Sequence, residues 1–169
     1  MKSRQIHRGM FIVEFAIVAS VLFVVLLAAI ELSRMIWIWN TVDEATRRGA
    51  RLAAVCEIGH SDIPEATIFA SSGETTSPIL RGLEKCNVCV EYLNVDGTVL
   101  GTPAFEDVRY VRVSINSNSP SCQTCPKYDV DPIIPFVPGT YTLPTFETTL
   151  PSESLGYIPD SDPPQFGCL

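Results

Sequence analysis

Cysteines are the residues of this chain best suited to do chemistry. Four of them form two Cys-x-x-Cys pairs with 32 residues between the pairs. In a reducing compartment this spacing is typical of a tetrahedral zinc site, whereas in an oxidising one the same thiols form disulfides. The total is even, as three bridges require. The six are Cys56, Cys86, Cys89, Cys122, Cys125 and Cys168.

A single carboxylate, that of Glu14, interrupts an otherwise apolar run. From Met10 to Ile30 the 21 residues are apolar or small apart from this glutamate. An ionisable group inside a membrane span is costly and marks a functional site unless it is paired. Cleavage after Gly9 would leave an α-amino group on Met10, with which the Glu14 of a neighbouring subunit can pair. The alternative is that Glu14 lies at the cytoplasmic interface and extends its carboxylate into water.

The run from Met10 to Ile30 predicts a membrane-spanning helix. At about 1.5 Å per residue it covers roughly 30 Å, the thickness of a bilayer core. A small domain could not cover such a helix on all sides. A cleavable secretory signal is disfavoured because apolar residues resume from Met35 to Trp39. The basic leader, residues 1–9, marks the cytoplasmic side, and Trp37 and Trp39 suit the far interface.

This topology bears on the two uses of the cysteines. All six follow the apolar helix, so they lie in an oxidising compartment and disulfides are favoured over zinc. Six cysteines allow fifteen connectivities, among which the sequence does not choose. A bond from Cys168 would tie down the carboxyl-terminal tail. The alternative zinc ligands are Cys86, Cys89, Cys122 and Cys125, and no other cofactor is expected.

The amino-terminal residues resemble a known family. Residues 8–15 (RGMFIVEF) resemble a type IV prepilin processing site, with a basic leader, a glycine and a glutamate at mature position five. Over residues 8–54 the chain resembles the TadE-like minor pilins of tight-adherence (Tad/Flp) pilus systems. The motifs that carry this likeness are VEFAIV, IELSR and NTVDEATRRGAR, and residues 149–153 resemble the family's closing acidic motif. Ser20 stands where the family often has proline, and Arg48 where it has an acidic residue.

The resemblance implies a structural protein and not an enzyme. It implies cleavage between Gly9 and Met10 by a prepilin peptidase, insertion in the bacterial inner membrane with the carboxyl terminus periplasmic, and assembly through Glu14 and Phe15. The implied partners are a major pilin, a TadF-like minor pilin and the peptidase. The assembled protein would lie in the pilus at the cell surface.

The residues after the membrane span predict a helical stalk and a small head. Apolar or small residues recur every three or four positions between residues 40 and 57, which continues the helix as an amphipathic stalk. Short helices are predicted near residues 62–71 and after Ser77-Pro78. Strands are predicted at 88–95, at 98–100 after an Asp96-Gly97 turn, and at 108–116, where Val111, Val113 and Ile115 share one face.

The last 50 residues differ from the rest, because they hold ten of the thirteen prolines. Proline donates no backbone hydrogen bond, so we expect an extended wrap with one edge strand near residues 140–149. Asp129, Asp131, Asp160 and Asp162 are expected to be turn residues and not calcium ligands, because EF-hand spacing is lacking.

These observations predict an α+β, pilin-like fold. A long membrane and stalk helix carries a small antiparallel sheet and a proline-rich, disulfide-stapled wrap. The predicted segments are a cleaved leader (1–9), a transmembrane helix (10–39), a stalk (40–57), an α+β head (58–119) and an extended carboxyl-terminal region (120–169).

Composition and motifs restrict the function. A net charge of −7 argues against binding to nucleic acid, which needs a basic face. No phosphate-binding glycine loop or nucleophile elbow is present, and the two histidines, His7 and His60, form no catalytic set. The favoured function is a minor pilin that joins or primes a tight-adherence pilus for surface attachment. The alternative is a single-pass, membrane-anchored binding module whose acidic head is stabilised by disulfides.

Overall fold

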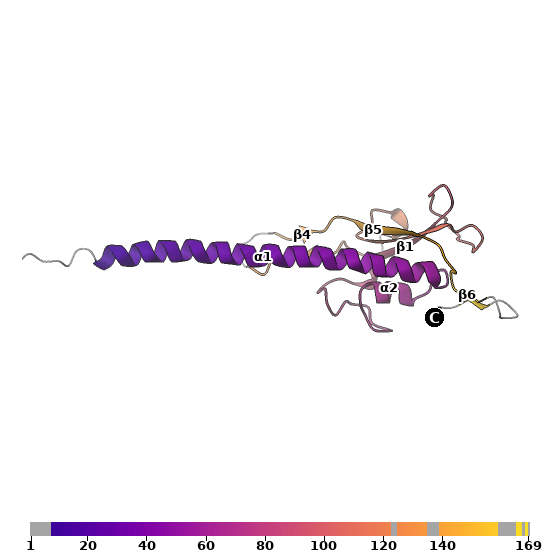
Figure 1. Ribbon diagram of the computed structural model, residues 1–169, viewed down its shortest axis with the longest axis horizontal. Coiled ribbons are helices and arrows are strands. Elements are labelled where there is room, and N and C mark those ends of the chain that lie inside the picture. Colours follow the sequence, from indigo (N-terminus) through magenta and orange to yellow (C-terminus); the bar gives the residue numbers. More distant parts are fainter. Residues whose placement is uncertain (1–7, 123–124, 135–138, 159–164, 167, 169) are drawn as a thin grey trace, which may run out of the picture.

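The computed structural model describes residues 8–122, 125–134, 139–158, 165–166 and 168. Figure 1 shows α1 projecting far beyond the other elements, which gather along its carboxyl-terminal part. The elements in order are the helices α1 (Arg8–Val55) and α2 (Asp62–Thr67), the 3-10 helix Lys85–Asn87, β1 (Val88–Leu93), β2 (Tyr110–Ile115), the 3-10 helix Pro120–Cys122, β3 (Asp129–Val130), β4 (Tyr141–Thr142), β5 (Phe146–Pro151), β6 (Tyr157–Ile158) and β7 (Gln165–Phe166).

Helix α1 has 48 residues and two different surroundings. It measures roughly 72 Å, more than twice a bilayer core. Its first half is apolar and exposed on every side, whereas the second half is amphipathic and buries one stripe against the head. The residues of that stripe that are fully buried include Val42, Ala45, Gly49 and Ala53, as the spacing predicts, while Leu52 is only half-buried.

The sheet consists of three antiparallel strands in the order β1-β2-β5. In the register, Val90 pairs with Val113 and Val113 with Thr148, so these side chains share the face that packs on α1. Val111, Val113 and Ile115 are all buried, as their alternation predicts. The opposite face carries Arg112. The predicted α+β class, with a long helix, an antiparallel sheet and disulfides, is therefore confirmed.

Two local predictions are wrong in part. The segment after Ser77-Pro78 is a closed loop and not a helix. The Ser77 hydroxyl accepts hydrogen bonds from the next backbone amides, as a helix cap would, but Gly82 turns the chain at φ +87°. The Ser77 amide then donates to the Leu83 carbonyl. Likewise, residues 98–100 return after the Asp96-Gly97 turn as one isolated bridge and not as a strand.

The carboxyl-terminal wrap caps the free end of α1. The last carbonyls of a helix lack partners within the helix. Here the amides of Glu153 and Leu155 donate to the Ala54 carbonyl, and the Gly156 amide donates to the Val55 carbonyl. The segment 149–153, singled out as a family-like motif, thus includes the end of β5 and the start of this cap. The disulfide Cys56–Cys168 joins the chain end to the same place.

A buried asparagine, Asn116, joins the sheet to the rest of the wrap. It follows β2 with φ +59°, and its side chain donates to the carbonyls of Tyr128 and Leu143 and accepts from the Tyr128 amide. These bonds place β3 and β4 beside α1, where the predicted edge strand near residues 140–149 is divided into β4 and β5. Asp129, expected in a turn, begins β3, and Asp160 and Asp162 lie outside the described residues.

Candidate functional site

The predicted processing site lies in the first turn of α1. Gly9 and Met10 are exposed, and a side chain added at Gly9 would meet nothing within 4 Å. The leader before Arg8 lies outside the described residues. Packing within the chain therefore does not explain a glycine at position 9. The exposed turn is accessible to a peptidase.

Glu14 lies one turn after Met10 on the same side of the helix, because residues i and i+4 share a face. It is exposed, and the described residues offer it no hydrogen-bond or ion-pair partner. Phe15, beside it, is 74% exposed, and Phe11 is 72% exposed. The predicted assembly residues, Glu14 and Phe15, therefore lie on an exposed apolar surface that carries one charge.

None of the described residues of the head covers this surface. A window of 18 residues in α1 reaches a mean hydropathy of 2.8 and buries none of its surface. By its length and composition α1 can cross a membrane, and its amino-terminal half has to be covered by lipid or by other helices.

An ion pair on α1 lies at the end of the apolar run, and the sequence analysis did not predict it. Glu31 and Arg34, separated by 2.5 Å, clamp the carboxyl-terminal wrap to the helix. Arg34 donates to the Asp131 carbonyl at 2.6 Å, and the Ile133 amide donates to Glu31 at 3.2 Å. Both residues belong to the IELSR motif. Their spacing of three on a helix was the available signal, because such residues are neighbours.

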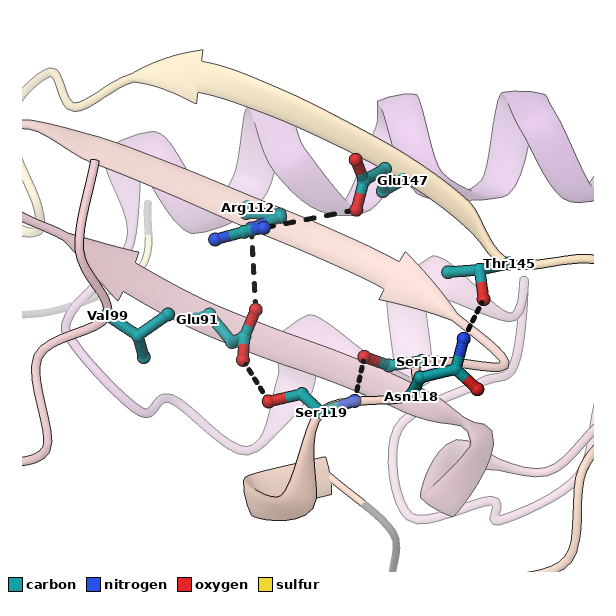
Figure 2. Close-up of a pocket in the computed structure, with 8 residues that line it drawn as sticks. All are labelled: Glu91, Val99, Arg112, Ser117, Asn118, Ser119, Thr145 and Glu147. Carbon is teal, nitrogen blue, oxygen red and sulfur yellow. Dashed lines mark hydrogen bonds and ion pairs between the residues drawn. The ribbon is translucent and has the colours of Figure 1, made fainter.

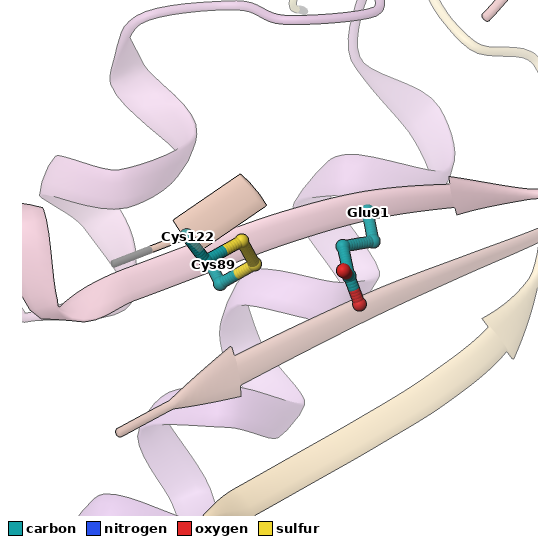
Figure 3. Close-up of side chains that lie close together, drawn as sticks. All are labelled: Cys89, Glu91 and Cys122. Carbon is teal, nitrogen blue, oxygen red and sulfur yellow. A yellow bond between two sulfur atoms is a disulfide. The ribbon is translucent and has the colours of Figure 1, made fainter. Parts of the chain in front are cut away.

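The six cysteines are joined in three disulfides in the structure. Cys56 pairs with Cys168, Cys86 with Cys125 and Cys89 with Cys122, so the two Cys-x-x-Cys pairs are joined to each other. Figure 3 shows the Glu91 carboxylate near the Cys89–Cys122 bond. These three side chains place their polar atoms within 4.8 Å of one another, but sulfurs bonded to each other offer no thiolate to a metal ion.

A charged cavity of about 450 Å³ opens beside the same carboxylate, on the face of the sheet that carries Arg112. Arg112 lies 3.4 Å from Glu91 and 4.0 Å from Glu147 (Figure 2). Glu91 is buried and also accepts a 2.7 Å hydrogen bond from Ser119. The two carboxylates pair electrostatically with the guanidinium across β1, β2 and β5, so this network is a structural cross-link of the strands.

Comparison with known proteins agrees with the resemblance that the motifs indicate. The family model for TadE-like proteins matches residues 9–51. The matched part begins at the glycine of the predicted processing site and ends in the buried part of α1. No curated protein and no solved structure matches the chain. The predicted likeness to TadE-like pilins is therefore confirmed over this helix, and the match does not extend into the head.

Proposed function

We propose that this chain is a structural minor pilin of a tight-adherence pilus. A prepilin peptidase cleaves it between Gly9 and Met10, the inner membrane holds it through α1, and it then joins or primes the filament. The observation that carries the proposal is the coincidence of three features in one segment. Helix α1 contains the TadE-like match, the exposed apolar surface and the unpaired Glu14.

The role of Glu14 follows from charge. A charged side chain within a membrane helix is costly, with a maximum of roughly 3 kcal/mol at the centre, so a carboxylate inside the apolar run is stabilised by a partner. Cleavage creates a positive α-amino group on Met10 of each subunit. A neighbouring subunit displaced along the helix axis brings this amine to Glu14, and the two charges neutralise each other in an apolar setting.

The other partners follow from the same surface. The apolar residues of the amino-terminal half face outward on all sides, so this half can pack against several pilin helices at once, including those of a major pilin and a TadF-like minor pilin. The part of the chain beyond the membrane span is acidic, with 8 basic and 17 acidic side chains in residues 40–169, and its head stays outside the helical bundle. TadE-like pilins are structural proteins, so we propose no catalytic activity for this chain.

Processing is tested with a Gly9→Leu variant in cells that carry the pilus system. Immunoblots should show a shortened wild-type protein and an unshortened variant. Gly101→Ala is the matched control, because an added side chain there also meets nothing within 4 Å. A variant that is shortened like the wild type would exclude cleavage at this glycine.

Assembly is tested with Glu14→Ala. The pilin proposal expects normal processing and membrane insertion but loss of pili by electron microscopy. The alternative, a membrane-anchored binding module, expects Glu14→Ala to leave localisation, binding and pili unchanged. Normal pili in this variant would therefore refute the assembly role and favour the anchored module.

A further inference from the structure

A groove of about 640 Å³ lies where the head meets α1, just after the apolar run. Helix α1 contributes Arg34 and Trp37 to its wall. The loop around Arg81 and the segment from Asp129 to Ile133 form the other sides. The groove is thus built from three segments that are far apart in the sequence and that meet only in the folded chain.

The depth of this groove relative to a bilayer follows from the helix. If Met10–Ile30 fills the hydrocarbon core, Arg34 lies four residues, or about 6 Å, beyond it. The headgroup layer on each side of a bilayer is about 5–7 Å thick, so Arg34 lies within it. Ile133, whose amide binds Glu31 one turn before Arg34, is 67% exposed. Trp37 is 50% exposed and lies about 4.5 Å further out than Arg34, where the headgroups meet water. An exposed tryptophan is favoured at such an interface.

A second, apolar groove lies closer to the amino terminus of α1. It has a volume of about 610 Å³ and lies along α1 from Val24 to Met35, with Ile134 and Tyr141 from the wrap on its other side. The one carboxylate in its lining, that of Glu31, is held in the clamp with Arg34. Apart from this clamped carboxylate the lining is apolar or aromatic, which suits the boundary of the hydrocarbon on the membrane side of Arg34.

The charges in the groove are of both signs. Arg34 and Arg81 bring two guanidinium groups, and Asp129 and Asp131 bring two exposed carboxylates. The hydrogen bonds of Arg34 to Glu31 and to the Asp131 carbonyl both use Nη2, and Nε is buried, so Nη1 is the nitrogen that a ligand can reach. A guanidinium has five N–H donors and matches phosphate oxygens well. The groove thus offers donors for an anion and acceptors for a cation side by side.

We propose that this groove binds the headgroup of a phosphatidylethanolamine in the periplasmic leaflet of the membrane. The lipid phosphate lies between Arg34 and Arg81, and its ammonium group donates to Asp129 and Asp131. An anionic lipid such as phosphatidylglycerol fits less well, because it lacks the cation that the two carboxylates need. Binding holds the head upright on the bilayer before assembly. This inference rests on the membrane insertion of α1 in the proposed function.

The test uses the purified full chain in detergent micelles and native mass spectrometry with added phosphatidylethanolamine or phosphatidylglycerol. The wild type should retain phosphatidylethanolamine more strongly than phosphatidylglycerol. Arg81→Gln, in an exposed loop, should weaken phosphatidylethanolamine binding about tenfold or more, because a charge-assisted hydrogen bond to the phosphate is lost. Asp129→Asn should reduce the preference for phosphatidylethanolamine. Arg109→Gln is the control, because Arg109 lies outside the groove.

Two results overturn the proposal. Equal binding of both lipids by the wild type would exclude recognition of the ammonium group, and equal binding by wild type and Arg81→Gln would exclude the phosphate site. Flotation with vesicles that contain both lipids separates this failure from that of the proposed function. If the wild-type chain floats but shows no lipid preference in mass spectrometry, only the headgroup site is excluded. If it does not float, membrane insertion is excluded as well.

Discussion

Substituting Gly49 with alanine should destabilise the fold, although alanine is the better helix former. Gly49 lies in α1 within the segment that matches TadE-like proteins. A Cβ atom here would overlap Thr67 Oγ1 in α2 and would lie 3.0 Å from Val113 Cγ1 in β2. Both neighbours are fully buried. The glycine therefore allows α1 to approach α2 and the sheet closely.

The size of the effect follows from three contributions. Overpacking a well-packed core costs about 1–3 kcal/mol. Thr67 Oγ1 donates a 2.7 Å hydrogen bond to the Ile63 carbonyl, so moving it away from the new methyl group costs about 1 kcal/mol more. Alanine regains about 1 kcal/mol from helix propensity. The net loss is about 2 kcal/mol in the free energy of unfolding, or roughly 4–8 °C in Tm for a chain of this size.

The assay is thermal unfolding of the full chain in detergent, followed by near-ultraviolet circular dichroism. Gly101→Ala, where an added side chain meets nothing, should change the free energy of unfolding by less than about 0.5 kcal/mol. Removing the obstructing side chain with Thr67→Ala should make Gly49→Ala cost less, with a coupling of about 1–2 kcal/mol between the two sites. The close-approach argument is refuted if Gly49→Ala is as stable as Gly101→Ala, or if the two substitutions add.

Two further predictions concern the head. Burial raises the pKa of Tyr92, so the folded state keeps its proton to higher pH than the unfolded state. The stability that the neutral Tyr92 provides is complete below the unfolded pKa of about 10 and is lost as pH rises through the folded pKa. The Tm of the wild type should therefore fall more steeply above pH 10 than the Tm of Tyr92→Phe. Parallel plots of Tm against pH for the two proteins would contradict this prediction. For the disulfides, intact mass should rise by about six hydrogens on reduction. Cys168→Ser should leave Cys56, which is buried, as a free thiol that a thiol reagent labels after denaturation, and should lower the free energy of unfolding by about 2–5 kcal/mol. A wild-type chain whose mass does not change on reduction, or that contains bound zinc, would exclude the three bridges.

Patterns that depend on one element were readable in the sequence. The apolar run and the stripe at Val42, Ala45 and Gly49 predicted α1, because helical periodicity is a local property. The alternation of Val111, Val113 and Ile115 predicted β2 and its buried face for the same reason. The leader and its glycine could be compared directly with a known processing site.

Features that depend on distant contacts were not readable. Ser77-Pro78 has the signature of a helix start, yet the Ser77 amide bonds to Leu83 across a closed loop, so a tertiary contact replaced the helix. The disulfide connectivity needed the fold, because the sequence allows fifteen arrangements. The roles of Asn116 and of the Glu31–Arg34 pair depend on backbone groups of the wrap, which no spacing along the chain reveals.

The central claim is that the mature chain begins inside the apolar segment, with its new amine one helical turn before Glu14. The most direct test is the amino-terminal residue of the protein isolated from cells, read by mass spectrometry of its first peptide. The account predicts Met10, with residues 1–9 removed. A mature chain that begins at Met1, or at any residue after the membrane span, would contradict it.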